Sequence, residues 1–219
     1  MTAGVIGIKG EAKKQMDDKV KKTLKALEKH GFKTAYAKDR KEACKKILEM
    51  SEGCASVGVG GTATVRSTGV VEALGERGLD VFDHWVVKNP VDQLAVRKSQ
   101  MTADLFLTGS NAVTMTGELV NMEGVGNRTN GMTFGPKKVI VVAGANKIVP
   151  DIQAGLERIE KIAGPKRAAE LKMRTPCAKS GECSDCNVEE RICRITVIHN
   201  RRPLLTDVTV MIVGEELGL

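Results

Sequence analysis

Four cysteines gather near the carboxyl-terminal end of this 219-residue chain, which contains six in all. They follow the spacing Cys-x5-Cys-x2-Cys-x6-Cys, as Cys177, Cys183, Cys186 and Cys193. Thiolates are soft ligands that suit zinc or an iron–sulfur cluster, and in a reducing compartment such a cluster indicates metal before disulfide. The spacing is neither a ferredoxin run nor the two tight pairs of a zinc ribbon. We expect a [4Fe-4S] cluster first and zinc as the alternative, with free or disulfide-paired thiols as a third option.

A second stretch that favours chemistry runs from Asp104 to Val149. Its apolar runs at 104–108 and 138–143 predict buried strands, and a third extended run covers 118–122. Gly-, Asn- and Thr-rich turns lie between them. Small polar loops at strand ends are where α/β sheets place their ligands. A polar segment of this length inside a periodic chain therefore indicates a site rather than a spacer.

Two charged residues of this stretch are candidates for catalysis. Glu118 begins an extended run beside polar turns, and the alternative is an ordinary surface glutamate. Arg128 lies in the Gly/Asn-rich segment 123–131, which we expect to be a loop. A guanidinium there can clamp a carboxylate or phosphate, and the alternative is a loop arginine in water.

A glycine pair follows the predicted strand 54–59. The sequence Gly60-Gly61-Thr62 leads from this strand into a helix start. Glycines let the backbone approach a ligand, and free N–H groups favour negative charge. The motif is neither a Walker A loop nor a full dinucleotide fingerprint, so a tight turn without a ligand remains the alternative.

The elements that must position these residues alternate along the chain. Predicted helices cover 11–30, 40–50, 70–77, 92–102, 151–163 and 165–173, and predicted strands cover 32–37, 54–59, 79–83, 104–107, 139–142, 195–198 and 208–213. The alternation predicts an α/β fold with a mostly parallel sheet and helices on both faces. We expect a single domain over 1–219, with a helical part at 1–50, an α/β core at 55–163, a Cys-rich insertion at 175–194 and strands at 195–213.

Composition excludes several classes of function. The formal charge is +7, and much of it lies between Lys13 and Lys46 on two predicted amphipathic helices, where a solvated face is expected. Aromatic residues make up only 3%, which argues against nucleic-acid binding by base stacking. No signal peptide and no apolar run long enough to span a membrane is apparent, so we expect a cytoplasmic protein.

The run TGSNAVTMTGELVNMEGVGNR, followed by FGPKKVIVVAGANKIVPD, resembles the LUD domain of lactate-utilisation proteins. The resemblance implies a fold of the NagB/RpiA/CoA-transferase-like type and a role in oxidising lactate to pyruvate. It also implies partners, namely the other subunits of a lactate-oxidation or electron-transfer complex. Residues expected by this analogy to line a pocket for a small anionic ligand or cofactor are Gly60, Gly61, Thr62, Gly109, Asn111, Glu118, Asn127 and Arg128.

Three functional hypotheses follow. The first is a redox protein of a lactate-oxidation system, an oxidoreductase component if it is an enzyme, with an iron–sulfur cluster on the four cysteines. The second is a non-catalytic subunit or adaptor with a structural zinc site. The third is a CoA-transferase-like enzyme that uses Glu118 as its nucleophile. We expect no nucleic-acid partner, and a homodimer through a sheet edge or helix face is compatible with the sequence.

Overall fold

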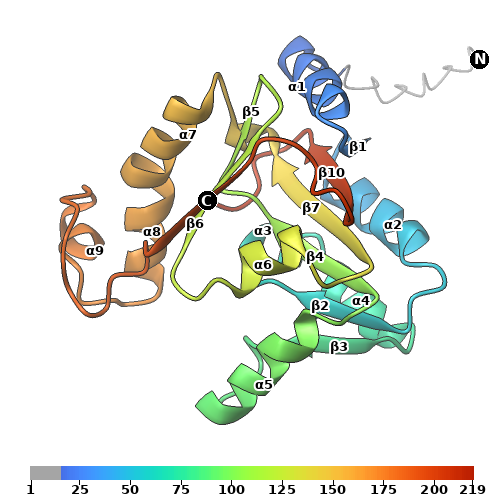
Figure 1. Cartoon of the computed structure of the whole chain (residues 1–219), viewed down its shortest axis with the longest axis horizontal. Coiled ribbons are helices and arrows are strands. Elements are labelled where there is room, and N and C mark those ends of the chain that lie inside the picture. The colour runs from blue at the N-terminus through green and yellow to red at the C-terminus, as the bar shows by residue number, and fades with distance from the viewer. Residues whose placement is uncertain (1–15) are drawn as a thin grey trace, which may run out of the picture.

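A computed structural model describes residues 16–219 of the chain (Figure 1). The unassigned segment 1–10 and the predicted start of the first helix at Glu11 lie outside the described residues. The helices are α1 (Asp18–Lys29), α2 (Arg40–Met50), α3 (Ala63–Arg66), α4 (Val70–Glu76), α5 (Pro90–Gln100), α6 (Asn127–Thr133), η1 (Ala145–Lys147), α7 (Ile152–Arg158), η2 (Ile159–Ala163), α8 (Gly164–Glu170) and α9 (Pro176–Ser180). The strands are β1 (Lys33–Ala37), β2 (Ser56–Val59), β3 (Asp80–Asp83), β4 (Leu105–Gly109), β5 (Ala112–Thr114), β6 (Leu119–Glu123), β7 (Lys138–Gly144), β8 (Ile148–Val149), β9 (Ile195–His199) and β10 (Asp207–Val213).

The main sheet has six strands in the order β1-β10-β7-β4-β2-β3, and every neighbouring pair is parallel. The prediction of an α/β fold with a mostly parallel sheet and helices on both faces is confirmed. Strand β7 lies in the middle and is buried on both sides, as an almost continuous apolar run requires. Its Ile140 and Val142 join one hydrophobic cluster, whereas Val139, Val141 and Ala143 join another.

Different elements cover the two faces of this sheet. On one face, α2, α3 and α4 pack their apolar side chains, including Ile47, Val65 and Leu74, which are fully buried. On the other face lie α1 and α6, through side chains such as Leu27 and Met132. Each helix on these faces therefore contributes a buried stripe, which is what the helical periodicity of α1 and α2 predicts.

A second, four-stranded sheet with the order β8-β5-β6-β9 packs beside the main one. Strand β6 is antiparallel to both β5 and β9, and only β5 and β8 run parallel. Helix α7 lies against this small sheet (Figure 1). Ile159 at the start of η2 belongs to the same hydrophobic cluster as Ala112 and Val120. The sequence did not predict this sheet, because β5 and β8 are too short to show alternation.

The segment 123–131 is not a loop throughout, because α6 begins at Asn127. The sequence of α6, NRTNGMT, consists mostly of poor helix formers, so local propensity predicts no helix. Tertiary packing decides the outcome, since Met132 is 1% exposed and packs in the core.

The predicted helix 151–163 is α-helical only as far as Arg158, because its last turn, η2, is π-helical. Ile159 is buried, but Ile162, three residues further on, is 40% exposed. A π-helical turn inserts an extra residue and so rotates the face that follows it. The described part of the chain, residues 16–219, contains no helix that is both long and apolar enough to cross a membrane.

The chain changes direction between β2 and β4. From β2 it proceeds outward to β3, and it then returns to place β4 on the opposite side of β2. In open α/β sheets the crevice at such a switch point, outside the carboxyl ends of the strands, is the usual ligand site. The loops that follow β2 and β4 begin at Gly60 and Ser110. The glycine pair after β2 and the polar loop after β4 therefore both lie at this point.

The close approach of α6 to the main sheet gives a testable prediction. A Cβ atom added at Gly131 would lie 2.6 Å from Cε1 of the fully buried Phe106. We expect Gly131→Ala to lower the free energy of unfolding by about 1–3 kcal/mol through overpacking, measured by urea denaturation.

The matched control is Gly75→Ala in α4, where the new Cβ would meet only Val81 at 3.7 Å. That change should raise the free energy of unfolding by about 0.5–1 kcal/mol, because alanine is the better helix former. Equal effects of the two substitutions would contradict the packing of α6 described above.

Candidate functional site

A cavity of about 700 Å³ opens at the carboxyl ends of the central strands, and we call it the strand-end cavity. It lies within the volume range of small-molecule sites. Its lining contains all six residues expected to bind a cofactor, together with Arg128: Gly60, Gly61, Thr62, Gly109, Asn111, Asn127 and Arg128. Residues from α5, η1, η2, α8, the segment after β3 and the cysteine segment complete the walls, among them Trp85, Arg97, Lys147, Arg167 and Cys193.

The glycines of the lining are required by packing between strand ends. Gly61 has φ +65°, a conformation that favours glycine, and a Cβ there would lie 3.0 Å from Cε1 of His84. At Gly109 a Cβ would lie 2.8 Å from Oγ1 of Thr62. Thr62 is the N-cap of α3, as the sequence predicts for a helix start. The glycines thus bring three strand ends together, and this close packing shapes the cavity.

Arg128 holds the wall between the two sheets. Its Nη1 donates to the carbonyl oxygen of Gly109 at 3.1 Å and to Oδ1 of Asn121 at 2.5 Å. Its Nη2 donates to Oδ1 of Asn111 at 3.0 Å and to the carbonyl oxygen of Met122 at 3.2 Å. All four acceptors are neutral, so Arg128 brings a positive charge to the cavity and its terminal N–H groups are already used by the protein. A bidentate clamp on a ligand, which the sequence suggested, is therefore not available to these nitrogens.

Two further buried cations lie beside Arg128. Lys147 is 4% exposed, lines the cavity, and donates from Nζ to Oγ1 of Thr64 at 2.8 Å. Arg158 is 9% exposed and donates to the carbonyl oxygen of Asn111 at 2.7 Å. Burial lowers the pKa of the Lys147 amine to about 7, and the charges of Arg158 and Arg128 add to the effect.

Helix α5 supplies another cation to the lining, Arg97. Its Nη1 donates only to Gln93 on the same helix, and its buried Nε has no partner among the described residues. Burial also lowers the pKa of this guanidinium. Gln100 at the end of the helix is fully buried and donates to the carbonyl oxygens of Val59 and Phe82, at 2.9 and 3.1 Å. Gln100 thereby fixes α5 against the ends of β2 and β3.

An aromatic wall faces these charges. Trp85, the only tryptophan of the chain, lies between two guanidinium groups, with Arg66 4.5 Å and Arg167 4.8 Å from its ring centre. The neighbouring His84 is 7% exposed, and its Nδ1 lies 3.0 Å from Nε2 of Gln100. Burial lowers the pKa of His84 to about 4, and the charge of Arg97 adds to it, so the ring is neutral at ordinary pH. His84 therefore has a hydrogen-bonded, structural role.

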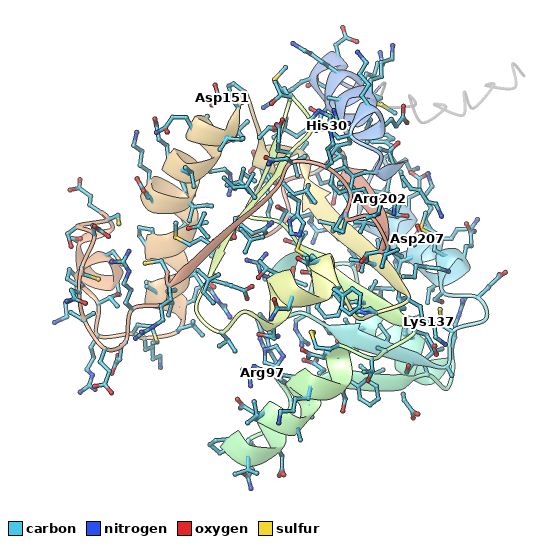
Figure 2. The ribbon with its side chains drawn as sticks, viewed as in Figure 1. His30, Arg97, Lys137, Asp151, Arg202 and Asp207 are labelled. Carbon is cyan, nitrogen blue, oxygen red and sulfur yellow. The ribbon has the colours of Figure 1, made fainter. Side chains whose placement is uncertain are left out.

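Glu118 does not line the strand-end cavity. It precedes β6 in the turn against α1, where its carboxylate accepts hydrogen bonds from Thr114 and, at 2.6 Å, from Thr116. Burial opposes its ionisation, but these hydrogen bonds prevail and lower the pKa of the carboxyl. Its other neighbour, His30, is far from Arg97 in Figure 2, at the opposite end of the molecule. The structure thus separates Glu118 from Arg128 and from the six predicted binding residues.

The four cysteines lie on α9 and in the irregular chain that follows it. All are free thiols, with Cys183 exposed and the other three half-buried. Arg191 links two of them through the main chain, donating to the carbonyl oxygens of Cys186 and Cys193 at 2.7 and 2.8 Å. Within residues 16–219 no three His, Cys, Asp or Glu side chains converge on a point that could hold a metal ion. As placed here, the thiols do not form a ligand set, and binding one metal through all four requires this segment to rearrange.

Three residues of this site, Lys147, Arg158 and Gln100, are not among those that the sequence predicts. Lys147 carried a usable signal, since it follows the apolar strand 139–142 at the edge where ligands bind. Arg158 is next to Ile159 in a helix, and nothing in the apolar periodicity distinguishes it from a solvated arginine. Gln100 precedes a strand by four residues, and its role depends on contacts with β2 and β3 that are distant in the sequence.

The cluster of cations predicts a pH-dependent stability. Below about pH 7, Lys147 is protonated in both the folded and the unfolded chain, and folding must bury its charge next to Arg128 and Arg158. Between about 7 and the ordinary value of 10.5, only the unfolded chain keeps the proton, so the stability contributed by this group rises with pH.

We therefore expect Lys147→Met to stabilise the protein at about pH 6, by on the order of 1–4 kcal/mol, and by less at about pH 9. Urea denaturation in buffers without small carboxylates or phosphate measures the difference. The control is Lys166→Met, which removes an exposed lysine and should change stability little at either pH. A constant effect of Lys147→Met across this range would contradict the assigned cause.

Comparison with known proteins agrees with this architecture. A crystal structure of a DUF162 family protein from Deinococcus radiodurans is similar to the chain with a TM-score of 0.55 at 14% sequence identity, and the similarity covers 90% of this chain and 97% of that one. At this identity the likeness concerns the fold alone. No curated protein matches the chain significantly. The family model of the LUD domain matches residues 20–213, most of the sequence. The chain therefore belongs to the LUD domain family.

Proposed function

We propose that this LUD-domain protein binds a small organic carboxylate, of the 2-hydroxy or 2-oxo acid class, in the strand-end cavity. In this proposal it works as a component of a lactate-oxidation system together with other subunits. The link to lactate comes from the family, and the preference for an anion comes from the cavity.

The observation that carries the proposal is a group of four cations, of which Lys147 and Arg158 are buried and Arg97 and Arg128 are half-buried. Arg97, Arg128 and Lys147 line the cavity, and Arg158 lies behind it. None of the four has an ion pair within the described residues, whereas the nearby Arg66 and Arg167 pair with Asp83 and Glu170. Buried charges in proteins are normally paired, because leaving them uncompensated is costly. An anionic ligand would supply the missing partner.

The polar and apolar parts of the lining suit an organic acid better than an inorganic ion. Lys147 has three N–H groups, of which one is used by Thr64, and Arg97 has an unpartnered Nε. The lining also contains apolar side chains, among them Met122, Ile159, Leu171 and Ile192, and the ring of Trp85. A molecule with a charged end and a carbon skeleton would contact both surfaces.

Trp85 gives a direct measurement of binding, because it is the only tryptophan and lies in the lining. We expect its fluorescence to change and saturate when lactate or pyruvate is added. Lactamide, which has the shape of lactate without its charge, should have no comparable effect. Equal responses to lactate and lactamide would refute recognition of the carboxylate.

Substitutions then test which charges are responsible. Lys147→Met should weaken lactate binding about 10-fold or more, the amount expected for loss of a hydrogen bond to a charged group, and Arg97→Gln should weaken it as well. The matched control is Arg77→Gln, because Arg77 is exposed, donates to the carbonyl oxygen of Leu48 and does not line the cavity. Unchanged affinity in both cavity variants would contradict the proposal.

A second proposal concerns the cysteine segment. Ile192 and Cys193 belong to the lining of the strand-end cavity, so a group held by this segment would lie beside the bound acid. We propose that the segment rearranges to bind a metal through Cys177, Cys183, Cys186 and Cys193, with a [4Fe-4S] cluster as the first choice and zinc as the alternative. A cluster would make electron transfer the function of this segment, and zinc would make it structural.

Purification without oxygen, followed by metal analysis and a visible absorption spectrum, distinguishes these outcomes. For a cluster we expect a brown protein with about four irons per chain and broad absorbance near ~400 nm. One zinc per chain would support the structural alternative. Metal-free, colourless protein would refute both. As a control, Cys44→Ala leaves the four clustered cysteines intact and should not change the metal content.

A further inference from the structure

Lys147 has the surroundings of a reactive amine. It ends η1, directly after β7, and its side chain is held between the sheet and the cavity with 4% exposure. Its one hydrogen bond among the described residues joins Nζ to Oγ1 of Thr64 at 2.8 Å. A hydroxyl can donate as well as accept, so this contact is compatible with a neutral amine as well as with an ammonium.

A buried structural lysine normally forms an ion pair with a carboxylate, and Lys147 forms no ion pair within the described residues. The charged groups that act on it are Arg158 and Arg128, both of the same sign. Together with burial they lower its pKa to about 7, so a large part of the amine is neutral at physiological pH. A desolvated lysine next to another cationic group is one of the arrangements that activate lysine as a nucleophile.

We propose that Lys147 is a nucleophile that forms an imine with the C2 carbonyl of a 2-oxo acid bound in the strand-end cavity. The inference rests on the proposed carboxylate binding, narrows the ligand to the 2-oxo acids and names the reacting atom. The positive charges of Arg128 and Arg97 favour the carboxylate of the acid. Lys147 lines the same cavity, so its amine is the nucleophile available to the neighbouring carbonyl carbon.

The reaction needs no oxidant or further reagent. The lone pair of Nζ forms a bond to C2, and the electron pair of the carbonyl bond moves to its oxygen. The oxygen then takes up a proton while the nitrogen releases one, which gives the neutral carbinolamine. The carbinolamine then loses its hydroxyl as water after a second protonation, and the C–N double bond forms. The products are one imine and one water, and the imine carries a positive charge when its nitrogen remains protonated.

Reductive trapping tests this step. The full-length protein is incubated with pyruvate or 2-oxoglutarate in the presence of sodium borohydride, which transfers hydride to an imine and makes the bond permanent. Intact-mass measurement followed by peptide mapping locates the adduct. Lactate, which has a hydroxyl in place of the carbonyl, is the matched acid and should give no adduct.

We expect the adduct at Lys147 to exceed that at any exposed lysine by at least ~10-fold, since each unit of pKa changes the neutral fraction about tenfold. Lys147→Arg, which keeps the positive charge, should lose the adduct while still binding pyruvate in a calorimetric titration. Lys166→Met, which removes an exposed lysine, should leave trapping at Lys147 unchanged.

The calorimetric titration separates the two levels of the proposal. If pyruvate binds but no adduct forms at Lys147, or if adducts are spread evenly over surface lysines, the imine is ruled out and the carboxylate site stands. If neither lactate nor pyruvate binds, both the carboxylate site and the imine are overturned.

Discussion

The guanidinium of Arg128 joins the two sheets at the point where they form a common wall. It donates to Gly109 at the end of β4 and to Asn121 and Met122 on β6. Without these bonds, the carbonyl and amide oxygens would have no cationic donor in a half-buried environment. The same residue that fixes the geometry therefore brings a positive charge to the cavity, so charge and shape have one origin.

Other polar contacts extend this framework around the cavity. Asn127, next to Arg128 on α6, donates to Oε1 of Gln100 at 3.1 Å, and Gln100 binds the ends of β2 and β3. Every strand end near the switch point is thus tied through a side chain to a helix on the same side of the sheet. Such a network holds the cavity open in a defined form before any ligand enters, which reduces the entropy lost on binding.

Patterns of residue type predict the parts of this structure that depend on local periodicity. The helices α1 and α2 and the buried strands β4 and β7 follow from their apolar repeats, and the polar loops after β2 and β4 follow from the glycines at 60, 61 and 109. The helix α6 and the small sheet could not be predicted, because they form through contacts between distant segments. Glu118 shows where prediction from sequence fails. A carboxylate between polar turns suggests a catalytic group, but in the structure it accepts hydrogen bonds from Thr114 and Thr116 and so closes the turn before β6.

The charges around Lys147 have opposite effects on binding and on nucleophilic attack. A bound carboxylate is negative and raises the pKa of a neighbouring amine, which reduces the neutral fraction that can attack a carbonyl. Arg128 and Arg158 act in the opposite direction, because both favour loss of the proton from Lys147. A site with Lys147 alone would bind the acid as an ammonium and would be protonated by the act of binding. In the proposed site the two guanidinium groups beside Lys147 offset the charge of the carboxylate, so that the amine would remain available for the reaction.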